Sequence, residues 1–189
     1  MASAFEPNRY VRLVEEFRRN KDEDFGSAID SPIPAGERST FPGLRYFPPD
    51  PALRITATVE KAEGGRAIRM QTSDGQERDY DRAAVLRFVV DGKEYHLTAF
   101  RTPDGDEDEP YFIPFRDAQS GKETYGAGRY LEIRPAHSHN GEARQVTLDF
   151  NLAYNPYCAY NPAYSCPIPP AENTLLIAIR AGEMTYHDH

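Results

Sequence analysis

Residues that could do chemistry gather in one stretch of this chain, Asp149 to Asn173 (DFNLAYNPYCAYNPAYSCPIPPAEN). The stretch contains a carboxylate at Asp149 and both cysteines of the protein, Cys158 and Cys166. It also contains the side-chain amides of Asn151, Asn155 and Asn173. A carboxylate can bind a ligand or act as an acid or base, and a thiolate can act as a nucleophile. The candidate functional site is therefore predicted in this segment.

Seven residues separate Cys158 from Cys166, a spacing unlike the C-x-x-C pattern of common redox and zinc motifs. Two reduced thiols packed in the loop, a disulfide, a metal site and a nucleophile all stay open at this point. A zinc site would need further ligands from the chain's histidines, His137 and His139 or His187 and His189. None of these spacings is diagnostic, so we predict no metal site.

Asp149 and Asn151 alternate with Phe150, so a strand would put both polar side chains on one face. If that face is buried, the carboxylate needs a partner, and Arg129 or Arg134 on a nearby predicted strand could supply it. The pattern fits either a structural network that fixes the loop or a ligand-binding or acid–base role for Asp149.

The segment Gln119 to Gly126 (QSGKETYG) superficially suggests a phosphate-binding loop. Such a loop needs its Gly-Lys-Ser/Thr at the start of a helix, whereas this segment precedes a predicted strand, so nucleotide binding is not predicted. The sequence leaves any cofactor unknown. Ser120 lacks the G-x-S-x-G elbow of serine hydrolases. A tight turn that presents Lys122, Tyr125 and Arg129 toward the cysteine loop is the functional alternative.

The candidate loop needs a scaffold, because its prolines exclude helix while its tyrosines bury large rings. We predict one domain over 1–189, with a helix at 7–21, a packed Pro/Gly-rich connector at 22–51 and a β domain at 52–183. The strands alternate polar and apolar residues, and Asp91-Gly92 predicts a tight hairpin turn. About nine strands are expected, the last at 174–183. The predicted fold is an antiparallel sandwich or barrel with an N-terminal helix and a long ordered Pro/Tyr-rich loop.

The composition limits the kinds of partner. The chain of 189 residues has a formal net charge of −8, which opposes non-specific binding to nucleic acid or anionic lipid. No window is apolar enough for a membrane span, and the N-terminus does not read as a signal peptide. We therefore predict a cytoplasmic protein that binds neither membrane nor nucleic acid. The acidic run at 104–109 is interpreted as a solvated loop.

Two long motifs resemble a known family: FIPFRDAQSGKETYGAGRYLE at 112–132 and LDFNLAYNPYCAYNPAYSCPIPPAENTLLIAIRAGE at 148–183. Together with FPGLRYFPPDP at 41–51, they are similar to domain of unknown function 1684. The resemblance implies membership of that family and carries no established activity with it.

Three functions follow as hypotheses. The first is a small-molecule-binding β domain with its site under the loop 149–173, because closed β structures commonly hold ligands at their mouths. Its tentative ligand-binding residues are Tyr125, Arg129, Asp149, Asn151, Asn155, Cys158, Cys166 and Asn173. The alternative is a hydrolase-like enzyme that uses Asp149 or Cys158. The third is a protein-interaction module that uses a sheet edge or the aromatic loop.

Overall fold

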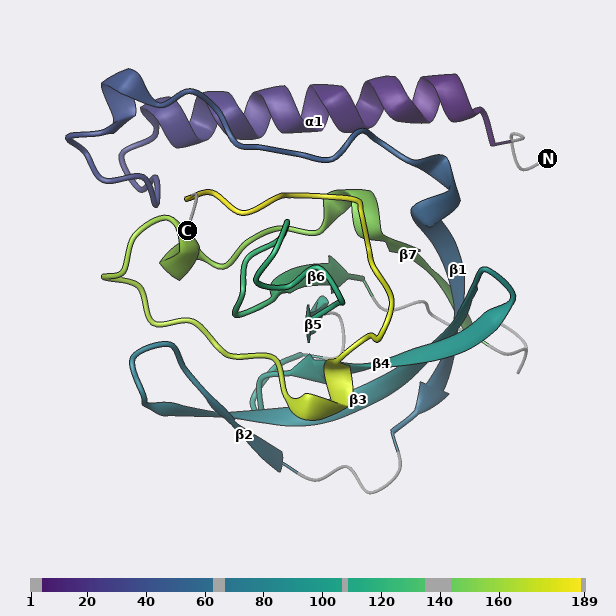
Figure 1. Cartoon of the computed structure of the whole chain (residues 1–189). Helices are drawn as coiled ribbons and strands as arrows, with labels where there is room; N and C mark the ends of the chain where they lie inside the picture. Colours follow the sequence, from purple (N-terminus) through teal and green to yellow (C-terminus); the bar gives the residue numbers. More distant parts are fainter. Residues whose placement is uncertain (1–4, 63–66, 107–108, 135–143, 188–189) are drawn as a thin grey trace.

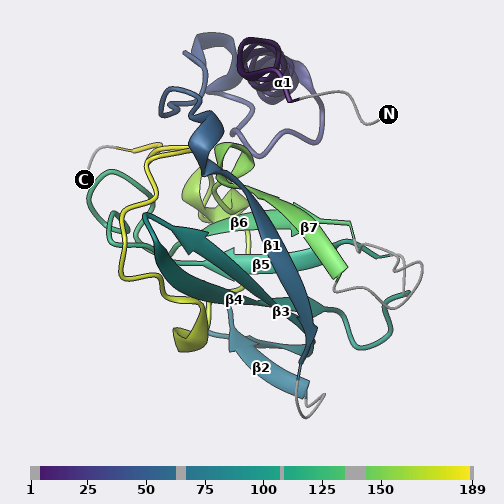
Figure 2. The same cartoon turned by 90° about the vertical axis from the view of Figure 1, so that its right-hand side faces the viewer.

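Helix α1 (Pro7–Ser27) lies across one side of a curled antiparallel sheet in the computed structural model of the protein (Figures 1 and 2). The structure describes residues 5–62, 67–106, 109–134 and 144–187. Within them the sheet has seven strands: β1 (Arg54–Lys61), β2 (Ala67–Gln71), β3 (Glu77–Val90), β4 (Lys93–Arg101), β5 (Tyr111–Phe115), β6 (Arg129–Ile133) and β7 (Arg144–Asp149).

The strand order is β6-β5-β4-β3-β1-β7, and β2 pairs with the first part of β3. The sheet curls into a half-barrel whose two end strands are β6 and β7. The structure thus confirms a mainly β, antiparallel fold with an N-terminal helix. It shows one curled sheet, with seven strands in the described residues, instead of the nine strands and the sandwich that we had considered.

Two predicted strands account for the difference in count. The residues before and after Ala84, which we counted as two strands, belong to one continuous strand, β3. In the part of the chain that the structure describes, the segment 174–183 forms no strand and makes only isolated bridges, at Thr174 and Glu183. Its carbonyls are bonded instead by the Arg129 guanidinium, which donates to Ile179, Ala181 and Glu183.

The helix prediction is correct at its start and wrong at its end. Pro7 occupies the first turn, as expected, but the helix continues past Lys21 to Ser27. The extra turn brings the Phe25 ring into edge contact with Tyr160 of the loop, at 5.4 Å between ring centroids. Phe25, Tyr160 and Ile33 of the connector form a small buried cluster. Ile33 of the connector thus packs against the end of the helix and the loop.

The hairpin turn at Asp91-Gly92 is confirmed. Strands β3 and β4 pair Val90 with Lys93 across it, and both turn residues have positive φ, 50° for Asp91 and 73° for Gly92. Such φ values match the right-handed twist of the flanking strands, and Gly adopts them without steric cost.

The inner face of the sheet holds the main core, which includes Leu86, Leu97, Ile113 and Leu148. A bulge between Arg82 and Ala84 changes the register of β3 against β4. Ahead of the bulge, Tyr80 stacks on Phe112, at 5.5 Å between ring centroids. The first part of β3 therefore contributes to a second aromatic layer apart from the main core.

Strands β4 and β5 share one paired position, Phe100 with Phe112, and then separate. Pro114 of β5 has no N–H to donate, so pairing could not continue regularly there. The side chain of Asn173 fills the gap: its Oδ1 accepts from Thr98 N–H at 2.8 Å, and its Nδ2 donates to the carbonyls of Thr98 and Pro114, each at 2.8 Å. The Asn173 side chain thus makes the hydrogen bonds that would otherwise join β4 directly to β5.

Candidate ligand-binding groove

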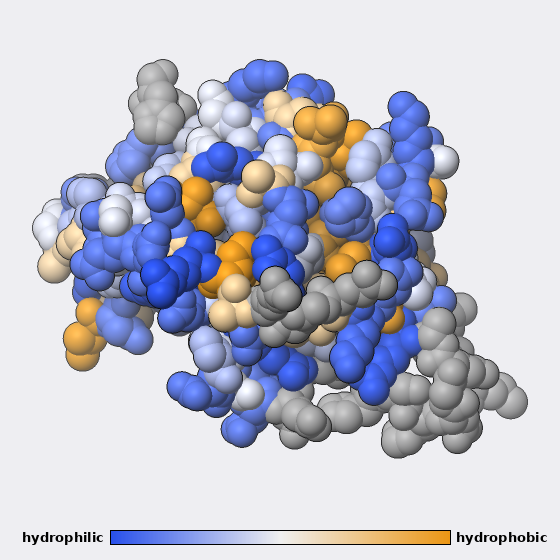
Figure 3. Space-filling view, turned by 90° about the horizontal axis from the view of Figure 1, so that it is seen from below, coloured by the Kyte–Doolittle hydropathy of each residue, from blue (hydrophilic) through white to orange (hydrophobic). Residues whose placement is uncertain are grey.

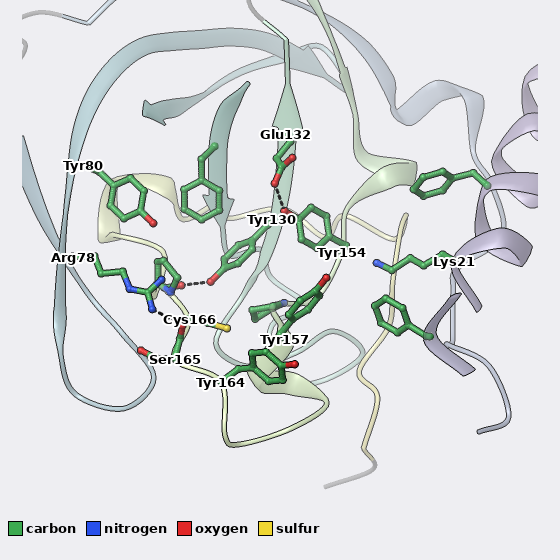
Figure 4. Close-up of a pocket in the computed structure, with 15 residues that line it drawn as sticks. Lys21, Arg78, Tyr80, Tyr130, Glu132, Tyr154, Tyr157, Tyr164, Ser165 and Cys166 are labelled. Atoms are coloured by element: carbon green, nitrogen blue, oxygen red, sulfur yellow. Dashed lines mark hydrogen bonds between the residues drawn. The ribbon is translucent and has the colours of Figure 1, made fainter. Parts of the chain in front are cut away.

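A groove of about 540 Å³ lies between helix α1, the outer side of β5 and β6, and the loop 154–167 (Figure 4). Alternation along β6 turns Leu131 to the core and Tyr130 and Glu132 to the groove. The loop supplies the opposite wall. The complete lining is Phe17, Lys21, Phe25, Arg78, Tyr80, Phe112, Tyr130, Glu132, Tyr154, Pro156, Tyr157, Tyr164, Ser165, Cys166 and Pro167.

Aromatic rings touch one another along the groove. On the strand side, Tyr130 meets Phe112 at 4.7 Å and Tyr154 at 5.8 Å between ring centroids. On the loop side, Tyr157 and Tyr164 meet edge to face at 5.2 Å. Such pairs fix the rings in place and leave their free faces to a ligand.

The tyrosine hydroxyls of the groove differ in their partners. Tyr130 donates to the carbonyl of Pro167, and Tyr154 donates to Glu132 Oε1 at 2.7 Å (Figure 4). Burial raises the pKa of both phenols, so both stay protonated as donors. Within the described residues, the hydroxyls of Tyr157 and Tyr164 have no hydrogen-bond partner. These two hydroxyls are therefore free to bind a ligand.

Charged groups lie at the two ends of the groove. Lys21 Nζ lies 5.0 Å from the ring centroid of Phe25 and 5.1 Å from that of Tyr154. Lys21 also pairs with Glu183 at 2.6 Å, so the buried carboxylate compensates the ammonium. At the other end, the Arg78 guanidinium donates to the carbonyl of Ser165 at 3.0 Å.

Both cysteines of the loop are free thiols: Cys166 is buried and lines the groove, and Cys158 is partly exposed and lies behind it. The backbone N–H of Cys158 donates to Cys166 Sγ at 3.3 Å, and the Tyr125 hydroxyl lies 3.9 Å from Cys158 Sγ. Ser73, in the turn after β2, bonds the loop through its N–H and its hydroxyl. Three separate segments therefore converge on the thiol pair.

The surroundings of the two thiols shift their pKa values in opposite directions. A hydrogen bond from the Cys166 thiol, with further ones from Ser73 and Tyr125, lowers the pKa of Cys158 to about 6. The same hydrogen bond, together with burial, raises the pKa of Cys166. Burial and the neighbouring Cys158 raise the pKa of Tyr125 to about 12. Cys158 is therefore the more acidic thiol of the pair.

A second cavity of about 450 Å³ adjoins the first and shares Phe17, Glu132 and Tyr154 with it. It lies between the end strands β6 and β7 and includes Asp149. Both oxygens of Asp149 accept from the Tyr10 hydroxyl, at 2.7 and 2.8 Å. Arg54 lies 3.9 Å from this carboxylate. The partners of Asp149 are thus Tyr10, Arg54 and Asn151, and the expected pairing with Arg129 or Arg134 is wrong.

Asn151 and Asn155 fasten the loop to the rest of the chain. Where a strand was considered for Asp149 to Asn151, the structure has a 3₁₀ turn, Phe150–Leu152, in which Phe150 enters the core. The Asn151 amide bonds the backbone of Asp50 in both directions, at 2.7 Å each. Asn155 donates from its side chain to the carbonyl of Met184 at 2.8 Å and from its N–H to Glu183 at 2.9 Å.

Arg129 points away from the groove into the interior, where 1% of its surface is exposed. Its guanidinium pairs with Asp117 at 2.8 Å and bonds three carbonyls of the segment 179–183. Burial lowers the pKa of Arg129, and Asp117 opposes that shift. The predicted turn thus presents Tyr125, but not Arg129, to the cysteine loop.

The structure brings Tyr125, Cys158 and Cys166 together and leaves the other predicted residues in separate networks. Lys21, Tyr130 and Glu132 were not among the residues predicted from the sequence to form the site. The alternation in GRYLEIR does place Tyr130 and Glu132 on one face, which was a usable signal. Lys21 carried no such signal, because its position depends on how α1 crosses the sheet. Of the possible zinc ligands, His137, His139 and His189 lie outside the described residues.

Seen from below, the surface is mainly hydrophilic, with apolar residues in small groups (Figure 3). Among the described residues, no three His, Cys, Asp or Glu side chains are grouped so that they could hold a metal ion. In the same part of the chain, no helix is long and apolar enough to cross a membrane.

Comparison with known proteins gives a family and a fold. The solution NMR structure of an uncharacterised protein from Haloarcula marismortui is 41% identical, with a TM-score of 0.73 over 96% of this chain and 97% of that chain. A search of curated proteins gave no match. A family model described as "protein of unknown function (DUF1684)" matches residues 39–184. The chain therefore belongs to the DUF1684 family.

Proposed function

We propose that this protein binds a small organic compound in the aromatic groove under the loop 149–173. The observation that carries the proposal is the groove itself, whose volume of about 540 Å³ lies within the usual range for ligand pockets, about 300–1,000 Å³. Its walls are rings held by mutual contacts, and such preorganised surfaces bind with a small entropy cost.

The lining indicates the class of ligand. Ring faces favour a compound with a flat or apolar body, and the unpaired hydroxyls of Tyr157 and Tyr164 favour polar groups at its rim. Of the predicted residues, Cys166 lines this groove, Tyr125 and Cys158 lie behind it, and Asp149 lines the adjoining cavity. The other predicted residues would affect ligand binding only by holding the loop in place: Arg129, Asn151, Asn155 and Asn173.

Ligand screening by protein NMR tests this proposal. We expect compounds that bind to shift the signals of Tyr130, Tyr154, Tyr157 and Tyr164. Tyr157→Ala should weaken binding about tenfold, equivalent to about 1.4 kcal/mol, since a ring wall is lost. Tyr157 is 42% exposed, so the fold should tolerate the change. Leu176→Ala is the control, because Leu176 is 87% exposed and lines neither cavity. Equal effects of the two variants would contradict the proposal.

An enzyme with Cys158 as nucleophile is the second candidate, favoured by the lowered pKa of that thiol. Asp149 is the weaker choice because the Tyr10 hydroxyl and the Asn151 amide already occupy its carboxylate. Hydrolysis of activated esters or thioesters, measured for the wild type and Cys158→Ser, tests this candidate. Turnover that survives the substitution would exclude Cys158 as the nucleophile.

A further inference from the structure

The thiols of Cys158 and Cys166 are arranged for a reaction that does not depend on ligand binding. The backbone N–H of Cys158 donates to Cys166 Sγ at 3.3 Å. The Cys166 sulfur therefore lies against the backbone of the residue that carries the other thiol. Cys158 is partly exposed whereas Cys166 is 8% exposed, so a reagent in solution meets Cys158 first.

The surroundings of the two sulfurs are unequal. The Tyr125 hydroxyl lies 3.9 Å from Cys158 Sγ, and hydrogen bonding with Cys166, Ser73 and Tyr125 lowers the pKa of Cys158. Donors around a sulfur stabilise its thiolate, which is the nucleophilic form. Cys166 is closed in between the loop and the turn at Ser73, whose N–H donates to the Cys166 carbonyl at 2.9 Å. One attacking sulfur and one resolving sulfur thus lie side by side.

We propose that Cys158 and Cys166 form a peroxide-reactive dithiol, in which Cys158 reacts first with a hydroperoxide and Cys166 then closes a disulfide. In the first step the Cys158 thiolate attacks the terminal oxygen of the hydroperoxide. The O–O bond breaks, Cys158 becomes a sulfenic acid, and the alkoxide leaves as the alcohol after taking a proton from water.

In the second step the Cys166 sulfur attacks the Cys158 sulfur. The S–S bond forms, the S–O bond breaks, and the hydroxyl leaves as water with the proton from Cys166. Two thiols are oxidised by two electrons, and the hydroperoxide is reduced to an alcohol and water. A dithiol reductant restores the starting state. Since Tyr157 precedes Cys158 and Cys166 lines the groove, the disulfide would tie the two ends of the loop wall together.

The test is titration of the reduced protein with hydrogen peroxide, followed by intact mass and by dimedone, which labels sulfenic acids. We expect the wild type to lose the mass of two hydrogen atoms and to regain it with dithiothreitol. Cys166→Ser keeps a hydrogen-bond donor beside Cys158 but cannot form the disulfide, so it should accumulate a dimedone adduct at Cys158. Cys158→Ser should give at least tenfold less adduct at Cys166 for the same dose.

Three results would overturn the proposal. One is direct oxidation of Cys158 to the sulfinic acid with no disulfide, and another is equal labelling of both cysteines in the two variants. The third is a wild type that stays unchanged at a peroxide dose that oxidises free cysteine. Far-UV circular dichroism of each serine variant shows whether the fold is retained, and ligand binding plays no part in any readout.

Discussion

Replacing Asn173 by alanine would remove the side chain that joins β4 to β5 where these strands separate. The substitution leaves three backbone groups without a partner: the N–H and carbonyl of Thr98 and the carbonyl of Pro114. Asn173 is completely buried, at 0% exposure, so solvent does not reach these groups directly.

The magnitude follows from those three groups. A buried polar backbone group that loses its partner costs about 1–3 kcal/mol, so the sum is about 3–9 kcal/mol. A water molecule could enter the vacated space and offset part of this cost, because three polar groups would surround it. We therefore expect Asn173→Ala to lower the free energy of unfolding by about 3–5 kcal/mol, a large share of the about 5–15 kcal/mol typical of a domain.

Urea denaturation followed by far-UV circular dichroism measures this loss, and thermal unfolding should show a Tm lower by roughly 6–20 °C. Asn161→Ala is a matched control, because Asn161 Oδ1 accepts a local bond from Ala163 N–H at 3.0 Å near the surface. That change should cost less than about 1 kcal/mol. If both variants lose equal stability, Asn173 does not bridge the strands as described.

Two further substitutions test other parts of the structure. Cys166→Ala removes the main hydrogen bond to Cys158, so the midpoint of iodoacetamide alkylation at Cys158 should rise from about pH 6 toward the ordinary range of a free thiol; an unchanged midpoint would show that other donors set this acidity. Gly182→Ala should cost more than about 3 kcal/mol in urea denaturation, because φ at Gly182 is +75° and the new Cβ would lie 2.5 Å from the Ala153 carbonyl oxygen. Gly36→Ala is its control, with no atom within 4 Å of the added Cβ, and equal losses would contradict this steric argument.

The sequence was most informative where one local rule decides the structure. Period-two alternation identified most of the strands, and Asp91-Gly92 identified the hairpin, since few other turns join strands so closely. The strand predicted from alternation at 174–183 is wrong. The alternation there arises because Ile179 and Ala181 face the core. Pairing there depends on the Arg129 guanidinium, which takes the place of a neighbouring strand. The local sequence pattern does not indicate that a side chain, and not a strand, bonds this segment.

The candidate site was predicted in part for a similar reason. The density of tyrosine, proline and cysteine located the loop, because this composition buries rings without regular structure. Which groups face each other depends on long-range packing: Tyr125 reaches Cys158 across 33 positions, and Tyr10 reaches Asp149 across 139. Contacts between residues so far apart along the chain cannot be predicted from local spacing. The predicted arginine partner of Asp149 was therefore wrong.

The contact between Lys21 and Glu183 has a consequence for other members of the family. The family model begins at residue 39 and so excludes α1, yet Glu183, at its far end, is neutralised by a cation from that helix. Glu183 also accepts from the Tyr160 hydroxyl and the Asn155 N–H, and these neutral donors cannot balance its charge. A relative that lacks the helix must therefore provide a positive charge from elsewhere or replace the carboxylate. Covariation of these two positions across the family would record that dependence.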